Sequence, residues 1–428
     1  MPAVHEHTLP NGMTLLCMRQ QHLHSIHFGL YLKGGSLYEN AQTQGMSHLL
    51  EHLCFRGLGG LTHEELNQAQ SRMGAELFGA TYPEAVVFEM NALPHFFGDL
   101  LRLFARFFAD RPWTQEQIVQ EKQVVLRQIE QAEDGFDDTV ERRFRETSHG
   151  AFPVMGTAES VSAMSDSAIE RCRRMLFQPQ NACLCITGNL TKGMEAAAIA
   201  VMSDLKNTTD DPPFAQEVPQ GFLHRDEGSD LVVDEEGGQA RVHIAFDIDS
   251  SQVVPLLGQL LDAITAGNVD SLLFQTLREE EALVAEIESY IEELGAFRRL
   301  VIHYDVRQEK LQESLCRVFT LLARLKMYIR PVRLAMMRTQ FTENLVMAQD
   351  SAAEMNELMG WSWVAEDTSL CDLDAQSRMY DDLTHEDLQD AAQCVLRPSN
   401  LTISVQRDPE ADDADLAPLF AQLRAMLQ

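Results

Sequence analysis

Residues 164–188 read MSDSAIERCRRMLFQPQNACLCITG, and this stretch matches LTHEDLQDAAQCVLRPSNLTISVQR, residues 383–407, without a gap at an offset of 219 residues (383 − 164). Each copy predicts a capped helix, a turn centred on a proline (Pro179 or Pro398) with an asparagine two residues later, and an apolar strand. Two halves of similar architecture are therefore expected. The alternative is a chance match between helix–turn–strand units of two unrelated domains.

The length of the chain agrees with this division. Its 428 residues, of which 45% are hydrophobic, suffice for two ordinary globular domains. The stretch 206–221, KNTTDDPPFAQEVPQG, is polar, contains three prolines and has no apolar periodicity. We therefore expect an N-terminal domain over 1–207, a linker over 208–221 and a C-terminal domain over 222–428.

Short strand-like runs alternate with longer helical ones. SIHFGLYLKGGS (25–36) alternates at period two and ends in a Gly-Gly turn signal. LPHFFGDLLRLFARFFAD (93–110) repeats its apolar residues at helical spacing, as an amphipathic helix on a core does. This alternation favours α/β or α+β layers over an all-helical array.

The charge balance limits the partners. Lys and Arg number 34 against 65 Asp and Glu, which gives a net charge of −31. This charge repels phosphate backbones and anionic lipids, so nucleic acids and membrane surfaces are not expected partners. A cationic or extended peptide fits better, although solubility or a salty habitat is the simpler explanation of the charge.

The cysteines and the N-terminus indicate the compartment. The eight cysteines have neither the spacing of a disulfide framework nor a CxxC pair, so we expect buried free thiols at positions 17, 54, 172, 183, 185, 316, 371 and 394. MPAVHEHTLPNGMTLL lacks the basic and apolar regions of a signal peptide, and no apolar run is long enough to span a membrane. We expect a cytoplasmic protein.

Residues 45–57, GMSHLLEHLCFRG, contain the motif HxxEH. Positions i and i+4 of a helix share one face, so His48 and His52 can offer two imidazoles to one metal ion, with Glu51 beside them. Glu51 would take a proton from a water activated by zinc and pass it to the leaving amine during amide hydrolysis. The alternative is an ordinary helix with two solvated histidines.

Other histidines need no catalytic role. HLHSIH (22–27) has the spacing of alternating strand faces rather than of one tetrahedral centre. Thr62 with Glu65, and Thr384 with Asp387, have the spacing of capping boxes at helix starts, which explains the histidine within each segment.

Several segments in order resemble the M16 family of zinc metallopeptidases, the pitrilysin and mitochondrial-processing-peptidase type. They are HTLPNGMTLLCM, GLYLKGGSLYE, GMSHLLEHLCFRG, HGAFPVMGTAESVSAMS (149–165), FQPQNACLCITGNLT and AGNVDSLLFQTLREEEAL (266–283). The resemblance covers nearly the whole chain. It implies an α+β fold of two homologous α/β/α sandwich domains joined by a linker, enclosing a chamber that admits unfolded peptides, with zinc as the cofactor.

The third zinc ligand of the family is a glutamate on a later helix, seven positions after an acid that supports the site. In EKQVVLRQIEQAEDGFDD, Glu121 matches that acid, but Gln128 stands at the ligand position. His48, His52 and Gln128 would form a weaker zinc site, because a glutamine offers only a neutral carbonyl oxygen. Glu121, after a shift of the helix, or Glu130, after a local kink, could replace the missing carboxylate.

A second departure lies in the other half. The family binds peptide and stabilises the oxyanion with an arginine and, seven residues later, a tyrosine. Arg278 matches the arginine, but Ala285 stands in place of the tyrosine, and Tyr290 is five residues out of register. Losing one such donor typically costs about a hundredfold or more in rate. Arg278 can equally be a solvated residue beside three glutamates.

Two functions follow from the resemblance. The first is a zinc metalloendopeptidase that hydrolyses peptides in a closed chamber, as one subunit of a homodimer or beside a homologous partner, with Glu51 and Glu121 in catalysis. The second is an inactive or scaffold subunit of an M16 heterodimer that binds peptide without cleaving it. We favour the peptidase, because His48, Glu51, His52 and Glu121 are all present.

Overall fold

A computed structural model describes residues 3–132, 135–148, 152–209, 230–235, 238–294, 297–366, 372–408 and 415–428. The chain divides into two compact units. Unit 1 comprises Met1–Glu133, Ala151–Val218 and Glu343–Arg378, and unit 2 comprises Asp134–Gly150, Pro219–Thr342 and Met379–Gln428. Most of the expected linker, 210–221, lies outside the described residues, so the predicted domain boundary stays a prediction.

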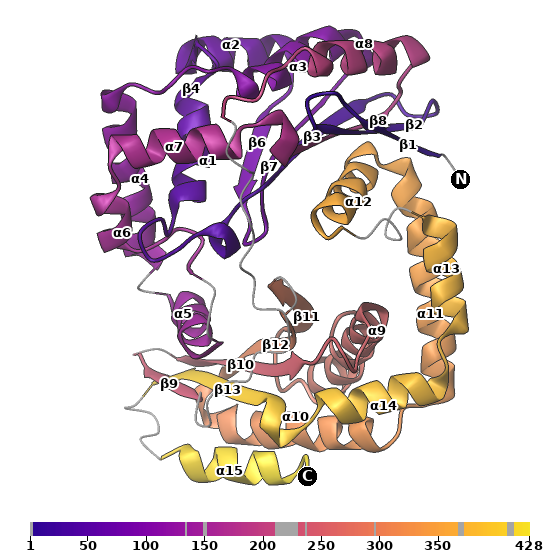
Figure 1. Cartoon of the computed structure of the whole chain (residues 1–428). Coiled ribbons are helices and arrows are strands. Elements are labelled where there is room, and N and C mark those ends of the chain that lie inside the picture. Colours follow the sequence, from indigo (N-terminus) through magenta and orange to yellow (C-terminus); the bar gives the residue numbers. More distant parts are fainter. Residues whose placement is uncertain are drawn as a thin grey trace. The chain divides into compact units, whose positions relative to one another are not determined.

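Unit 1 is built on a six-stranded sheet of order β1-β2-β8-β3-β7-β6 (Figure 1). Its strands are β1 (Val4–Thr8), β2 (Thr14–Arg19), β3 (Ile26–Lys33), β6 (Leu77–Thr81), β7 (Ala85–Ala92) and β8 (Ala182–Gly188). A short hairpin pairs β4 (Gly57–Leu58) with β5 (Leu61–Thr62). Strand β6 has a partner on one side only, so it forms an edge of the sheet.

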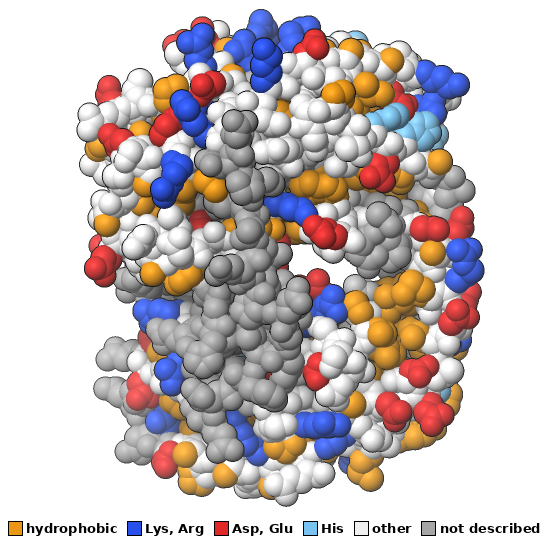
Figure 2. Space-filling model, in the orientation of Figure 1, with side chains coloured by type: hydrophobic (Ala, Val, Ile, Leu, Met, Phe, Trp, Pro, Cys, Tyr) orange, Lys and Arg blue, Asp and Glu red, His pale blue; other side chains and the backbone are white. Residues whose placement is uncertain are grey.

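Helices cover one face of this sheet. They are α1 (Met46–Arg56), α2 (His63–Met73), α3 (Phe97–Ala105), α4 (Gln115–Ala132), α6 (Ala158–Ala163), α7 (Asp166–Leu176) and α8 (Lys192–Ser203). The main core contains Phe28 and Leu30 of β3 together with Leu49 and Leu53 of α1. Figure 2 shows several Lys and Arg side chains on the outer surface over α2, α3 and α8.

The opposite face of the sheet is covered by α12 (Ala352–Val364), a helix from the C-terminal half of the chain (Figure 1). Met355 and Met359 of α12 pack with Tyr31 of β3 in a second core. The alternating pattern of residues 25–36 correctly predicted a strand, but seven of the eight residues of β3 are buried because helices cover both faces.

Unit 2 is built on a five-stranded sheet of order β11-β12-β10-β13-β9. Its strands are β9 (Leu231–Asp234), β10 (Gln239–Ile248), β11 (Ile287–Leu294), β12 (Phe297–Arg307) and β13 (Leu401–Arg407). Its helices are α5 (Phe136–Ser148), α9 (Pro255–Thr265), α10 (Leu311–Met327), α14 (His385–Val395) and α15 (Ala417–Ala425), with a π-helix over Phe274–Glu280. Two further helices, α11 (Pro331–Met347) and α13 (Leu373–Asp382), begin in one unit and end in the other.

Each half of the chain contributes one helix to the unit built mainly from the other half. Helix α5 follows α4 in sequence but belongs to unit 2, and α12 belongs to unit 1. Within unit 2, Arg299 of β12 is buried and binds both Glu141 of α5 and Glu292 of β11. The sequence pattern did not anticipate this exchange, because it depends on contacts between residues far apart in the chain.

The internal repeat has the predicted structure in both copies. Helix α7 and strand β8 begin at Asp166 and Ala182, while α14 and β13 begin 219 residues later, at His385 and Leu401 (385 − 166 and 401 − 182). The capping boxes of Thr62 and of Thr384 are also confirmed. These elements depend on helix caps, a proline and an asparagine within a few positions of one another, and such signals can be recognised in the sequence.

The cysteines and the helix lengths agree with the composition. All seven cysteines within the described ranges are free, and five of them are buried, while Cys316 and Cys394 are half-buried and Cys371 lies outside those ranges. Within the same ranges, none of the helices combines the length and the hydropathy of a membrane span.

Candidate metal centre

Helix α1 carries the two histidines of the HxxEH motif on the side that faces α4. Leu49, Leu50 and Leu53 bury the other side of α1 in the core. The rings of His48 and His52 lie edge to face with centroids 4.6 Å apart, which is the arrangement that spacing i and i+4 produces. Their side chains are 14% and 18% exposed, so a small ligand can reach both.

The start of α1 is held by the carboxylate of Glu39, a half-buried residue. Glu39 accepts hydrogen bonds from the backbone N–H groups of Gly45 and Ser47, at 2.7 Å each. These are unpaired donors of the first helical turn, where a negative charge is favoured. Burial raises the pKa of Glu39 to about 7, against the lowering effect of these hydrogen bonds. Gly45 has φ 83°, and a Cβ there would lie 2.4 Å from the carbonyl oxygen of Met155, so glycine is required.

Helix α4 places one polar side chain against each histidine. Nε2 of His48 lies 3.3 Å from Oε1 of Gln128, and Nδ1 of His52 lies 3.1 Å from Oε2 of Glu121. Arg56 also binds the Glu121 carboxylate, whose side chain is only 4% exposed. Burial raises the pKa of Glu121, but the hydrogen bonds from His52 and Arg56 outweigh burial and hold it below its usual value.

Glu51 points toward the edge strand β6. Thr81 at the end of β6 donates from Oγ1 to Oε2 of Glu51 over 3.1 Å, and the same oxygen lies 3.6 Å from Nδ1 of His48. A Cβ at Gly79 would come within 3.0 Å of Oε1 of Glu51 and within 2.8 Å of the ring of Phe55. Glycine at this position therefore leaves room for the carboxylate beside the edge of the sheet.

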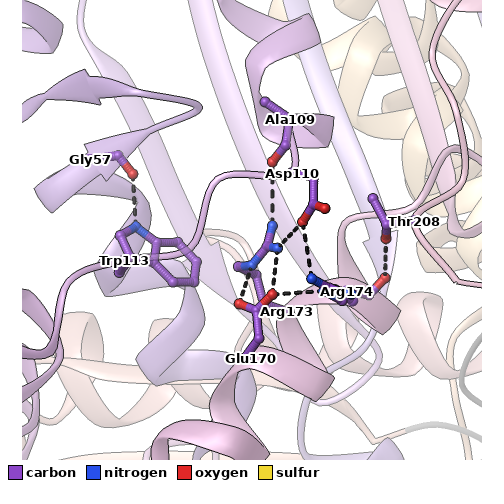
Figure 3. Close-up of polar contacts among 8 residues, drawn as sticks. All are labelled: Gly57, Ala109, Asp110, Trp113, Glu170, Arg173, Arg174 and Thr208. Carbon is purple, nitrogen blue, oxygen red and sulfur yellow. Dashed lines mark hydrogen bonds and ion pairs between the residues drawn. The ribbon is translucent and has the colours of Figure 1, made fainter.

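A polar network fixes α1 relative to the start of α4 (Figure 3). Nε1 of Trp113, just before α4, donates to the carbonyl oxygen of Gly57 over 2.8 Å, at the end of α1. Arg173 of α7 is 4% exposed and binds Glu170 and Asp110, with contacts of 2.7 Å to each carboxylate. These contacts join α7 and the segment before α4 to the helix pair that carries the centre.

The donor set fits a metal ion incompletely. In the part of the chain that the structure describes, no three His, Cys, Asp or Glu side chains are grouped to hold a metal ion. The pair of histidines is present, and Glu121 on Nδ1 of His52 leaves Nε2 of that ring for a metal, as an outer carboxylate does in zinc sites. The third candidate is the amide oxygen of Gln128, a neutral donor. Glu130 is exposed, and the carboxylate of Glu121 is bound to His52 and Arg56.

Arg278 lies in unit 2. It belongs to the π-helix, with its guanidinium 4.7 Å from the ring centre of Phe274 and 3.7 Å from Glu279. The chain then turns through Ala282, a non-glycine residue with φ 48°. A π-helix and a left-handed alanine are uncommon features that often accompany functional sites.

Ala285, in the position of the family's tyrosine, lines a cavity of about 1000 Å³ in unit 2. Tyr290 is on β11, where its ring contacts His303 at 5.8 Å between centroids. Tyr290 is 43% exposed.

The sequence analysis did not identify three residues that shape the centre. They are Glu39 at the start of α1, Arg56 on Glu121 and Thr81 on Glu51. Arg56 had a detectable signal, because it lies four residues after His52 and so shares its helix face. Glu39 and Thr81 had no detectable signal in the sequence, because they lie outside α1, in a loop and on strand β6.

Comparisons with known proteins define the class and then the family. The fold resembles that of solved peptidases: a protease from Helicobacter pylori has a TM-score of 0.83 at 17% identity, over 95% of this chain and 100% of that one. A peptidase M16 inactive domain from Pseudomonas fluorescens has a TM-score of 0.82 at 18% identity, over 95% and 98%. The chain thus has the fold of these proteins, with an HxxEH helix in unit 1.

Sequence profiles identify the family itself. The profile described as Insulinase (Peptidase family M16) matches residues 16–156, and that described as Peptidase M16 inactive domain matches residues 164–341. An "Uncharacterized zinc protease" of Rickettsia felis is 24% identical over 366 residues, which is 83% of this chain and 86% of that protein. The chain belongs to peptidase family M16.

Proposed function

We propose that the chain is a zinc-dependent metalloendopeptidase with a weakened metal site. The observation that carries this proposal is the double pairing between α1 and α4: His48 with Gln128, and His52 with Glu121. Neither pairing follows from the HxxEH motif alone. The name of the Rickettsia felis relative, a zinc protease, supports zinc as the metal.

His48, His52 and Gln128 would hold the zinc ion. A bound zinc ion would supply Lewis acidity and make a water molecule acidic enough to act as a nucleophile near neutral pH. Glu121 accepts a hydrogen bond from Nδ1 of His52. This bond orients the ring and makes its other nitrogen, Nε2, a more basic ligand. Arg56 holds Glu121 in place from the other side.

Glu51 is the general base in this mechanism. Thr81 occupies its Oε2, which leaves Oε1 to take a proton from the attacking water and to deliver it to the leaving amine. The position of Oε1 beside Gly79 brings this proton close to the edge of β6. A peptide that pairs with this edge as an additional strand would pass its backbone along Glu51.

The weakened ligand set and the missing tyrosine favour a second candidate, a subunit that binds peptide without cleaving it. Gln128 lowers the expected zinc affinity, and Ala285 offers no hydroxyl for the oxyanion. In this alternative a homologous partner chain carries out the chemistry. The two candidates differ in one readout, hydrolysis by the isolated, zinc-loaded chain.

The partners proposed here are a peptide substrate and a second M16 chain. A homologous partner would supply the tyrosine that Ala285 replaces, and a homodimer is the simpler form. Sedimentation should then give a species heavier than the 48.2 kDa chain. A monomer, both alone and with a homologous chain added, would exclude the dimer. The closed chamber and the cytoplasmic location are parts of the same proposal. The free buried thiols support the cytoplasmic location.

The decisive experiment compares the protein with its Glu51→Gln variant on internally quenched peptides. Both proteins are loaded with one equivalent of zinc, and the cleavage rate is measured. The variant keeps both imidazoles and nearly the same volume, so we expect equal zinc content and loss of hydrolysis. Equal hydrolysis by the two proteins would rule out Glu51 as the base. No hydrolysis by either would favour the non-cleaving subunit.

A further inference from the structure

A basic segment of this acidic chain forms an exposed corner of unit 2. Residues 314–342, SLCRVFTLLARLKMYIRPVRLAMMRTQFT, contain six Arg and Lys residues and no Asp or Glu, whereas the net charge of the whole chain is −31. They form most of α10 and the start of α11, which meet at residues 328–330 (Figure 1). We call six exposed side chains at this junction the α10–α11 corner: Arg324, Met327, Tyr328, Arg330, Val332 and Met336. None of them takes part in the mechanism above.

Four side chains of the corner are apolar or aromatic and face water. Met327 is 79% exposed, Tyr328 61%, Val332 55% and Met336 46%. Single exposed apolar side chains are common on proteins, but four within residues 327–336 form a patch, and such patches mark binding surfaces. Val332 and Met336 are four residues apart on α11 and therefore share one face of that helix.

The two arginines of the corner lie on the same side as Met327 and Tyr328. Arg324 precedes these two residues by three and four positions, which is the spacing of a shared face at the end of α10. Exposure alternates through the turn that follows: Tyr328 and Arg330 are exposed, whereas Ile329 between them is buried. The side chains of Tyr328 and Arg330 therefore point to the same side, and cations flank the exposed apolar pair on both sides.

Helix α14 holds the backbone of the corner in place. The N–H group of Ile329 donates to Oε1 of Gln389 over 2.7 Å, and Nε2 of Gln389 donates to the carbonyl oxygen of Lys326 over 2.8 Å. His385 also binds the carbonyl oxygen of Ile329. The exposed side chains are therefore presented on a fixed turn, so the backbone loses little conformational entropy when the corner binds.

The guanidinium groups of the corner are not neutralised within the protein. Arg317 and Arg333 of the same segment each bind a carboxylate. In the part of the chain that the structure describes, neither Arg324 nor Arg330 forms such an ion pair. Two guanidinium groups can therefore bind phosphate groups, which they contact through paired, charge-assisted hydrogen bonds.

The local charge at the corner is positive although the whole chain is acidic. Burial lowers the pKa of Lys326, and the nearby charge of Arg397 adds to this effect. Helix α14 brings the carboxylates of Glu386 and Asp387 toward the corner, but Asp387 accepts hydrogen bonds from Thr384. At physiological ionic strength, charges more than about 8 Å away are largely screened. Membrane surfaces were not expected as partners because of the total charge, and the corner has the opposite sign.

We propose that the α10–α11 corner docks on the surface of an anionic membrane, with Met327 and Tyr328 among the lipid headgroups and Arg324 and Arg330 on the lipid phosphates. Basic side chains around an apolar patch combine attraction to anionic lipid with burial of apolar area. Tyrosine is enriched at membrane–water interfaces, because its ring is apolar and its hydroxyl stays hydrated. A specific protein partner would require roughly 800 Å² of surface on this side, more than four partly exposed side chains supply.

Sedimentation of the full-length protein with lipid vesicles tests this proposal, which does not depend on the metal centre. Vesicles of phosphatidylcholine alone are compared with vesicles in which about one third of the lipid is phosphatidylglycerol, which carries one negative charge. We expect the partition coefficient to be at least about tenfold higher on the anionic vesicles, because two arginines contribute to the attraction. The difference should decrease as salt is added, because salt screens this attraction.

Variants of the corner then test the assignment. The double variant Met327→Ser and Tyr328→Ser removes the apolar pair, and the double variant Arg324→Gln and Arg330→Gln removes the two charges. All four positions are exposed, so both proteins should fold and should melt at the same temperature as the unmodified protein. Each double variant should lower the partition coefficient on anionic vesicles by about tenfold.

Matched controls change the same residue types at exposed positions outside the corner. They are Val346→Ser with Met347→Ser, and Arg102→Gln with Arg111→Gln, and both should keep full vesicle binding. Equal binding by the corner variants and their controls, or no binding by the unmodified protein, would overturn the proposal. Corner variants that leave vesicle binding unchanged but weaken self-association in sedimentation velocity would also overturn it, and would identify the corner as an interface between chains.

Discussion

Replacing Gln128 by glutamate tests whether α4 supplies the third metal ligand. Oε1 of Gln128 lies 3.3 Å from Nε2 of His48, so the replacement puts a negative oxygen beside the histidine pair with almost no change in volume. Removing an outer partner of a ligand typically changes metal affinity by 10- to 100-fold, and a change of ligand should have at least this effect. We therefore expect zinc to bind at least tenfold tighter, about 1.4 kcal/mol or more.

Competition with a chromophoric chelator at pH 7.5 measures the zinc affinity. Gln123→Glu adds the same charge at an exposed position of α4 and is the matched control, with an expected change of less than twofold. At limiting zinc, Gln128→Glu should also increase peptide cleavage, and the increase should vanish when Glu51→Gln is added. An affinity that does not change in Gln128→Glu, or that changes equally in the control, would refute the assignment of this ligand.

Three further predictions concern the surroundings of the centre and the second unit. Glu121→Gln should weaken zinc binding by about 10- to 100-fold, because His52 loses its negative partner, and an unchanged affinity in the same chelator assay would contradict this. Arg173→Met should lower the free energy of unfolding in urea by about 2 to 3 kcal/mol, because Glu170 and Asp110 lose the buried guanidinium that binds both of them. Arg174→Met, at a half-exposed position, should cost under about 0.5 kcal/mol, and equal losses in the two variants would be inconsistent with the network. Burial raises the pKa of Asp262 to about 6 from its ordinary value of 3.8. Between about pH 4 and pH 6 the folded state therefore holds a proton on Asp262 that the unfolded state releases. The free energy of unfolding should decrease as the pH rises through this range. Asp262→Asn should remove that slope and exceed the unmodified protein in stability at pH 7 by up to about 3 kcal/mol, and parallel melting curves for the two proteins from pH 4 to 7 would disprove it.

The sequence predicted those parts of the fold that depend on neighbouring residues. The helix–turn–strand units around Pro179 and Pro398, and the capping box of Thr62, are recognisable because a cap, a proline and an asparagine act within a few positions. The pairing of His48 and His52 follows from helical spacing in the same way.

The exchange of helices could not be predicted from such patterns. Helix α12 packs on β3 because Gly29 and Gly360 lack side chains where Asn356 and Tyr31 approach: a Cβ would come within 2.1 Å of a neighbouring atom at either glycine. Asn356 donates to the carbonyl oxygens of His27 and Cys185, 329 and 171 positions away in sequence. A contact of this range leaves no periodic signal in the sequence.

The residues around Glu51 show the same limit within the candidate centre. The motif identified Glu51 as a base, but its orientation depends on Thr81, which comes from the edge strand 30 positions away. Glu39 likewise reaches the start of α1 from a preceding loop. Local spacing thus predicted which groups could react, and the sheet decides how they are oriented.

Anomalous diffraction at the zinc absorption edge tests the central claim most directly. Crystals grown with one equivalent of zinc per chain should show a single strong peak at about 2.0 to 2.1 Å from nitrogen atoms of His48 and His52, with the oxygen of Gln128 as the next ligand. A peak at any other site, or no peak between α1 and α4 in crystals of protein that contains one zinc per chain, would contradict the account.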